Sequence, residues 1–112
     1  MSFVFKKGIT YLWPVSFDVP TDGGKFEKKS FDVLFKRIPQ SKVKSLLSED
    51  SPATDNDFCK EVMAGWKGIK DENEQVIEFS ADSLAEILEE PGLARAIVIA
   101  FMESLAGAKA KN

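Results

Sequence analysis

Few side chains in this sequence could carry out catalysis or hold a metal ion. The chain has no histidine, which removes the most common general base and metal ligand. Its single cysteine, Cys59, would need carboxylate partners to bind zinc, and that combination is improbable. Because Cys59 falls on the inner face of a predicted helix, and a reactive thiol needs exposure and nearby positive charge, we expect it to be a small core residue.

Two acidic runs, at residues 55–57 and 71–74, supply oxygen ligands of the kind that calcium prefers. Neither run has the alternating ligands, central glycine and terminal glutamate of an EF-hand loop. We expect the first to cap a helix and the second to form a solvated turn. Gly23-Gly24 lacks the spacing of a phosphate-binding loop and fits a hairpin turn instead. The sequence therefore predicts a protein that is not an enzyme and that uses no metal or cofactor.

Basic side chains cluster around that turn and could contact nucleic-acid phosphates. The chain is acidic overall, with a pI near 5.0, and carries no recognised nucleic-acid motif. We therefore expect no nucleic-acid partner and keep two other roles open: docking on an acidic protein surface, or solubility and protection of a strand edge. The basic residues are Lys25, Lys28, Lys29, Lys36 and Arg37.

Charge is distributed unevenly along the chain. Residues 1–48 carry nine basic and four acidic residues, a net of +5, whereas residues 49–90 carry three basic and thirteen acidic, a net of −10. Residues 91–112 add three basic and one acidic, so the total is −3. The basic front and acidic middle could attract each other, either within one chain or between copies that self-associate, with solvated faces as the simpler alternative.

The elements that would position these residues begin with a β-hairpin. Residues 13–19 and 31–35 alternate apolar and polar side chains with a period of two, and Pro20–Gly24 between them is rich in turn residues. Pro14 places the first strand at a sheet edge or near its own start. Phe26 is out of phase with Phe31, which predicts a bulge or a long loop.

The remainder of the chain predicts helices. Ser41 is a candidate cap for a short first helix, and Thr54 with Asp57 forms a capping box for a second. Phe58, Val62 and Trp66 recur every four residues, which predicts that this second helix continues to Trp66.

After a short extended piece at 76–79, Ser80 is a good cap for a third helix. Residues 93–106 predict a last helix that is apolar almost all round, so it belongs to the core or is partly covered by a partner.

These elements define one domain with an α+β fold: an N-terminal antiparallel hairpin or small sheet packed against about four helices. We expect the hairpin region at 1–38, the helical region at 39–107 and a frayed tail at 108–112. No signal peptide or membrane-spanning stretch is evident, which predicts a cytoplasmic protein with no membrane partner.

The order of short motifs resembles small tail assembly chaperones of long-tailed, siphovirus-type bacteriophages or prophages. The resemblance runs from about Phe5 to the end of the chain, and no single motif in it is diagnostic. Its parts are Trp13-Pro14-Val15, Pro20-x-Asp-Gly-Gly, Phe31-x-Val-x-Phe, Gly65-Trp66-x-Gly-Ile69, Phe79-Ser80, Pro91-Gly92-Leu93 and the closing Lys111-Asn112.

The resemblance implies an assembly factor in the cytoplasm of the infected bacterium that is absent from the mature virion. Such proteins bind the tape measure protein, keep it soluble and help recruit tail tube protein, in many phages through a longer frameshifted form. Because lysine followed by asparagine can be encoded by an A-rich sequence, we hypothesise a slippery site at Lys111-Asn112. The main alternative is a structural virion protein (tail tube, tail terminator or head–tail connector subunit), and a host-directed inhibitor is a third class.

Candidate partner contacts follow from exposed apolar or basic residue types. Trp13 and Trp66 both lie near predicted element ends, where tryptophan is either core or a binding anchor. Phe101 is the candidate contact residue of the apolar last helix, and Lys28 and Lys29 are the candidate contact residues of the basic hairpin. The client is expected to be a long helical protein, bound by many copies through weak contacts.

Overall fold

A long antiparallel hairpin forms most of the sheet. The computed structural model describes residues 3–51 and 53–106, in which β1 spans Thr10–Thr21 and β2 spans Lys25–Lys36. The two strands stay in register along their whole length, from Thr10 opposite Lys36 to Thr21 opposite Lys25. β1 is an edge strand, as Pro14 predicted, because a proline cannot donate to a second neighbour.

The predicted bulge or long loop at Phe26 is wrong. Phe26 pairs directly with Pro20, and the turn needs only residues 22–24, where Gly23 and Gly24 adopt positive φ angles of 80° and 75°. Those angles cost glycine little, so the hairpin closes tightly and the strands extend past the alternating segments. The irregularity lies elsewhere, between Leu34 and Phe35 where β2 meets the third strand.

The third strand, β3 at Met63–Lys67, corrects the prediction of a helix running to Trp66. Helix α2 spans Asp55–Val62, and Met63 then takes an extended conformation with φ −95° and ψ 134°. The spacing of Phe58 and Val62 is helical, but Trp66 continues it by coincidence. β3 pairs antiparallel with β2, giving the order β1-β2-β3 and placing a strand inside the region predicted to be helical.

The remaining helices are α1 (Gln40–Leu47), α3 (Ala81–Ile87) and α4 (Leu93–Ala106). Ser80 caps α3 and Thr54 caps α2 as predicted, whereas α1 begins after Pro39 rather than at Ser41. The fold prediction is confirmed: the described chain is α+β, with a three-stranded antiparallel sheet and four helices. The predicted frayed tail lies outside the described residues.

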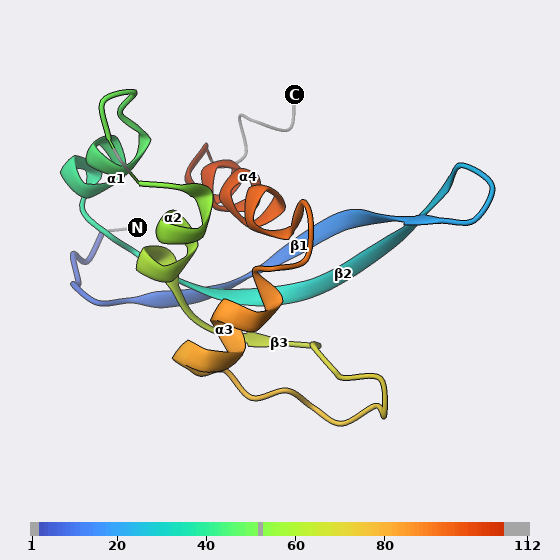
Figure 1. The fold of residues 1–112 in the computed structure, drawn as a ribbon. Helices are drawn as coiled ribbons and strands as arrows, with labels where there is room; N and C mark the ends of the chain where they lie inside the picture. The colour runs from blue at the N-terminus through green and yellow to red at the C-terminus, as the bar shows by residue number, and fades with distance from the viewer. Residues whose placement is uncertain (1–2, 52, 107–112) are drawn as a thin grey trace.

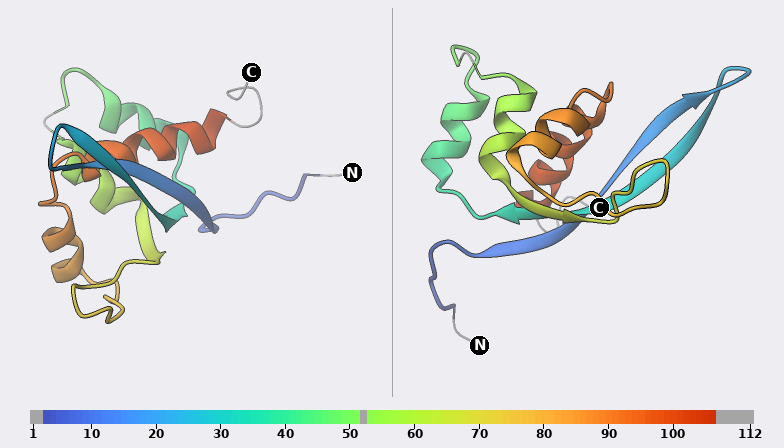
Figure 2. Two further views of the ribbon diagram at one scale, coloured as in Figure 1. Left: turned by 90° about the vertical axis from the view of Figure 1, so that its right-hand side faces the viewer. Right: turned by 60° about the horizontal axis from the view of Figure 1, so that its bottom comes forward.

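The helices gather over the part of the sheet away from the hairpin turn, so the turn end of β1 and β2 projects beyond the body of the molecule (Figure 1). Residues 3–8 leave the body at the other end of β1 (Figure 2). α4 packs against β1 and α2. The molecule therefore has a packed centre and two projecting segments at opposite ends of one strand.

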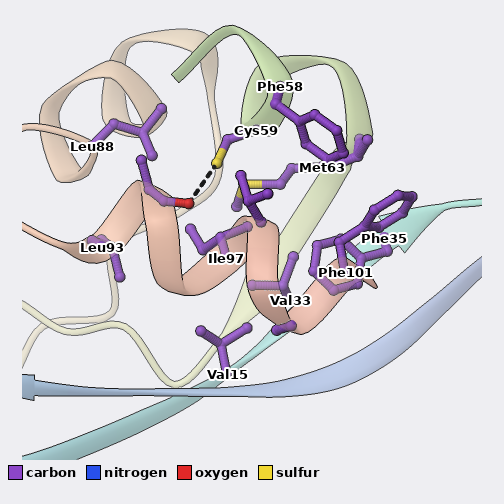
Figure 3. Packing of buried hydrophobic residues seen from close by; sticks show 14 of the residues in the cluster. Val15, Val33, Phe35, Phe58, Cys59, Met63, Leu88, Leu93, Ile97 and Phe101 are labelled. Carbon is purple, nitrogen blue, oxygen red and sulfur yellow. Dashed lines mark hydrogen bonds between the residues drawn. The ribbon is translucent and has the colours of Figure 1, made fainter. Parts of the chain in front are cut away.

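The core is centred on the inner face of α4. Phe101 packs edge-on against Phe35 of β2 and Phe58 of α2, with ring centroids 5.1 Å and 5.5 Å apart (Figure 3). Edge-to-face pairs of this kind contribute about 0.5–1.5 kcal/mol each beyond the area they bury. Phe101 thus ties sheet, α2 and α4 together.

Replacing Phe101 with alanine should lower the free energy of unfolding by about 3–5 kcal/mol, because a buried ring is lost and a cavity remains. Phe26→Ala is the matched control: Phe26 is 68% exposed, so its loss should change stability by no more than about 0.5 kcal/mol. Urea unfolding followed by tryptophan fluorescence measures both variants. Similar effects of the two substitutions would contradict this description of the core.

Candidate protein-binding surface

The two acidic runs serve local structure. The Thr54 amide donates to Asp57 Oδ2 at 3.0 Å and the Asp57 amide donates to Thr54 Oγ1 at 3.2 Å, so the first run caps α2 as predicted. These hydrogen bonds lower the pKa of Asp57. In the second run, Asp71 Oδ1 accepts the amides of Asn73 and Gln75 and closes a turn. Within the described residues, no three His, Cys, Asp or Glu side chains are grouped to hold a metal.

Cys59 is a core residue, as predicted. Its side chain is fully buried and its thiol donates to the backbone carbonyl of Ala94 at 3.5 Å, joining α2 to the first turn of α4 (Figure 3). Burial raises the pKa of the Cys59 thiol to about 12, with the Asp55 carboxylate adding to the shift. The thiolate, which is the reactive form, is therefore suppressed at neutral pH.

The structure corrects the prediction that Phe101 contacts a partner. Phe101 has no exposed surface, so it cannot touch another protein while the fold is intact. Other side chains of α4 are accessible. Ile99, on the side opposite Phe101, is 50% exposed, and so is Leu105, one helical turn beyond Phe101, whereas Met102 between them is half-buried. These three residues are spaced by three, so they lie in one row along the flank of the helix, which we name the α4 stripe.

Trp66 has a clear structural role. Its indole N–H donates to the backbone carbonyl of Ile77 at 2.7 Å, and its ring packs edge-on against Phe79 with centroids 4.9 Å apart. Both contacts hold the extended segment before α3 against β3. Trp66 is half-buried in this arrangement, so its predicted role as a binding anchor stays a prediction.

Trp13 lies beside the α4 stripe rather than beside Trp66. In the sheet, Trp13 pairs with Val33, which pairs with Trp66, so the two tryptophans share one row but are separated by a strand. Trp13 borders a groove of about 410 Å³ between the start of β1 and the end of α4. The groove is lined by Ile9, Tyr11, Trp13, Arg37, Ser104 and Leu105.

A hydrogen bond of 2.7 Å between the Tyr11 hydroxyl and Ser104 Oγ joins two of the residues that line this groove and links β1 to α4. Leu105 belongs both to the groove and to the α4 stripe. The stripe and groove therefore form one apolar surface with Trp13 at one side, a surface that a helical segment of another protein could occupy. The sequence signal for it was weak, because α4 is apolar on almost every side.

Lys28 and Lys29 lie in the half of β2 nearest the hairpin turn, opposite Asp18 and Phe17 of β1, and line no part of the groove beside α4. Lys29 Nζ forms an exposed ion pair of 2.7 Å with Glu27. Residues 18–29 contain three lysines and three acidic residues, so their net charge is zero and the projecting hairpin is not a basic ribbon. The contribution of the two lysines to partner binding stays a prediction.

Comparisons with protein-family models, with curated protein sequences and with solved structures each found no significant match to this chain. No helix in residues 3–51 and 53–106 is long and apolar enough to span a membrane.

Trp66→Phe keeps the ring but removes the N–H donor to Ile77, and should lower the free energy of unfolding by about 1 kcal/mol. Hydrogen exchange of the backbone amides of Ile77 and its neighbours should become faster under conditions in which the protein as a whole stays folded. Trp13→Phe is the control, since within the described chain no hydrogen bond is seen for the Trp13 indole. Equal effects of the two substitutions would show that the Trp66 hydrogen bond contributes nothing.

Cys59 should make the free energy of unfolding decrease with rising pH in the alkaline range. Because its folded pKa of about 12 lies above the ordinary value of 9.0, the folded state holds the thiol proton more tightly. The contribution of this thiol to the free energy of unfolding is complete below the pKa that the thiol has in the unfolded chain. It is lost as the pH rises from about 9 towards 12. Urea unfolding across that range should show a steeper decline for the wild type than for Cys59→Ala; parallel curves would refute the assignment.

Proposed function

We propose that this chain is a tail assembly chaperone of a long-tailed phage or prophage, which binds the tape measure protein and keeps it soluble. Two things support the proposal: the resemblance in motif order, and the exposed apolar surface formed by the α4 stripe and the adjacent groove. The surface is the observation that carries the proposal. A chaperone of this kind needs a stable fold with exposed apolar area and needs no catalytic group.

The client would bind as a helix. An amphipathic helix presents apolar residues every three or four positions, and the α4 stripe offers Ile99, Met102 and Leu105 at matching intervals. Each contact is small, so one copy binds weakly. Many copies bound along one long client would cover its successive apolar segments, and contacts between neighbouring copies would add avidity.

In this proposal, the chain acts in the cytoplasm of the host bacterium and leaves before the virion is complete. Tail tube protein is recruited through a longer frameshifted form that begins with the same sequence. The proposed slippery site at Lys111-Asn112 lies outside the described residues. The nucleotide sequence of the gene tests this site. Codons for Lys111 and Asn112 that contain no slippery heptamer would exclude a frameshift at this position.

A structural virion protein is the second candidate, and the projecting hairpin favours it. A long hairpin that reaches beyond its own domain is suited to lie across a neighbouring subunit in a repeating assembly. Mass spectrometry of purified virions separates the two functions. The chaperone proposal requires the chain to be absent from mature particles, whereas a subunit would be present at a fixed stoichiometry.

Leu105→Lys should weaken capture of the tape measure protein encoded downstream by about tenfold, because it places a charge within the proposed apolar contact. Lysine also suits the end of a helix, so the fold should be retained. Co-expression followed by affinity purification and a client solubility assay measures the effect, with Ile99→Lys as a second variant.

The matched control is Leu47→Lys on α1, since Leu47 is 46% exposed and lies outside the α4 stripe. The control should capture client as the wild type does. Equal loss in all three variants, or none in any, would place the client elsewhere. A wild-type chain that neither binds the client nor keeps it soluble would leave the long form as the active species, or favour the virion-protein alternative.

A further inference from the structure

Among residues 3–51 and 53–106, one side of β2 lacks a neighbouring strand near the hairpin turn. A proline in a paired strand must turn its nitrogen away from the partner, so the pairs Pro14–Asp32 and Pro20–Phe26 are both of the non-hydrogen-bonded kind. By alternation, the backbone N–H and C=O groups of Phe26, Lys28, Ser30 and Asp32 face away from β1.

β3 covers only part of this edge. It pairs with Asp32 through Lys67, and Gly68 then turns the chain away with a φ of 90°. Within the described chain, no strand pairs with Phe26, Lys28 or Ser30 on that side. An exposed row of backbone donors and acceptors is a template for an added strand.

A groove lies directly beside the uncovered edge. It has a volume of about 590 Å³, and apolar side chains from both sheet and helices form its lining, among them Phe17, Phe31, Ile69, Ile87 and Leu93. A strand that extended the line of β3 along the free edge would point every second side chain towards this groove.

The rim of the groove is acidic on the helix side. Glu86, Glu89 and Glu90 border it at the end of α3 and in the connection to α4. Lys29 and Lys70 lie on the sheet and loop sides. An occupant with an apolar residue followed by a basic one would therefore fit both the lining and the three carboxylates.

The chain itself contains such a segment, Phe3-Val4-Phe5-Lys6-Lys7, which we name the N-terminal aromatic segment. It belongs to no helix or strand, and its apolar residues are largely exposed: Phe3 by 75%, Val4 by 66% and Phe5 by 72%. In an extended conformation, Phe3, Phe5 and Lys7 would share one face. That face carries the required combination of apolar and basic side chains.

The segment is too short to reach the free edge of its own chain. Phe31, beside which Phe5 would have to lie, is opposite Val15, five residues beyond the start of β1 at Thr10. Five strand residues span about 17 Å, and a strand added to β2 lies two strand spacings, about 10 Å, across the sheet from β1, so the direct distance is about 19 Å. Phe5 precedes Thr10 by five residues, which reach at most about 18 Å even without the chain reversal that this path needs. A segment of this kind on the free edge therefore comes from another copy of the chain.

We propose that the N-terminal aromatic segment of one copy adds as a strand to the free edge of β2 in a second copy. Phe5 enters the groove beside Phe31 and Ile87, and Lys7 meets the glutamates of the rim. Backbone hydrogen bonds to Phe26, Lys28 and Ser30 hold the added strand in register. This contact is separate from the α4 stripe and does not depend on the proposed chaperone function.

Disulfide trapping tests the contact directly. In a Cys59→Ala background, a chain carrying Phe5→Cys should form a mixed disulfide with a size-tagged chain carrying Ile87→Cys when the two are combined under mild oxidation. Leu47→Cys replaces Ile87→Cys as the control for random collision. Equal trapping at both positions, no trapping at either, or an intrachain disulfide in the Phe5→Cys/Ile87→Cys double variant would overturn the proposal.

Charge-reversal substitutions test the same contact independently, because self-association is then measured without any disulfide. Sedimentation velocity should show wild-type chains associating beyond 12.4 kDa as concentration rises. Lys7→Glu should weaken association by about fivefold, and Glu89→Lys/Glu90→Lys should restore part of it when combined with Lys7→Glu. Lys6→Glu, on the other face of the segment, is the control. A chain that stays monomeric, or equal effects at Lys6 and Lys7, would overturn the proposal.

Discussion

Phe101 lies where three parts of the chain meet, between Phe35 of β2 and Phe58 of α2. The other surfaces depend on this contact. It sets the rotation of α4 about its own axis, because a helix with apolar residues on nearly every side could pack in several ways. With Phe101 and Ile97 fully buried, Ile99 must face outwards. Leu105 follows Phe101 on the same side of α4 but is exposed near the end of the helix, beside the groove at the start of β1.

The same packing leaves the hairpin long and partly uncovered. The helices bury the inner face of the sheet at Val15, Val33 and Phe35, but β3 is only five residues long and stops at Lys67. The strands of the hairpin continue past it, so one side of β2 has no paired strand from the described part of the chain and borders an apolar groove. At the outer edge, Pro14 and Pro20 interrupt the donors of β1, which protects that side from further pairing. The free edge of β2 and the α4 stripe are the surfaces to which the proposed contacts are assigned.

Local signals in the sequence were sufficient for the elements that depend on neighbours in the chain. Alternation around residues 13–19, the capping residues Thr54 and Ser80, and the limits of the last helix all appear in the structure as predicted. The features that were predicted wrongly or missed depend on contacts between segments that are distant in the sequence. Trp66 continued a helical spacing by coincidence, and only pairing with β2 makes its segment a strand. The burial of Phe101 could not be inferred from a helix without a polar face, and the free edge of β2 could not be inferred without knowing where β3 ends.

In the proposed complex, the residues of the α4 stripe, and not the buried Phe101 ring, contact the client. Chemical-shift mapping of the labelled chain, titrated with helical peptides from the tape measure protein proposed as client, examines that contact residue by residue. We expect the largest chemical-shift changes at Ile99, Met102, Leu105 and the Trp13 indole, with Phe26 unaffected. Changes centred on the hairpin turn instead, or no saturable change with any peptide covering the client, would contradict it.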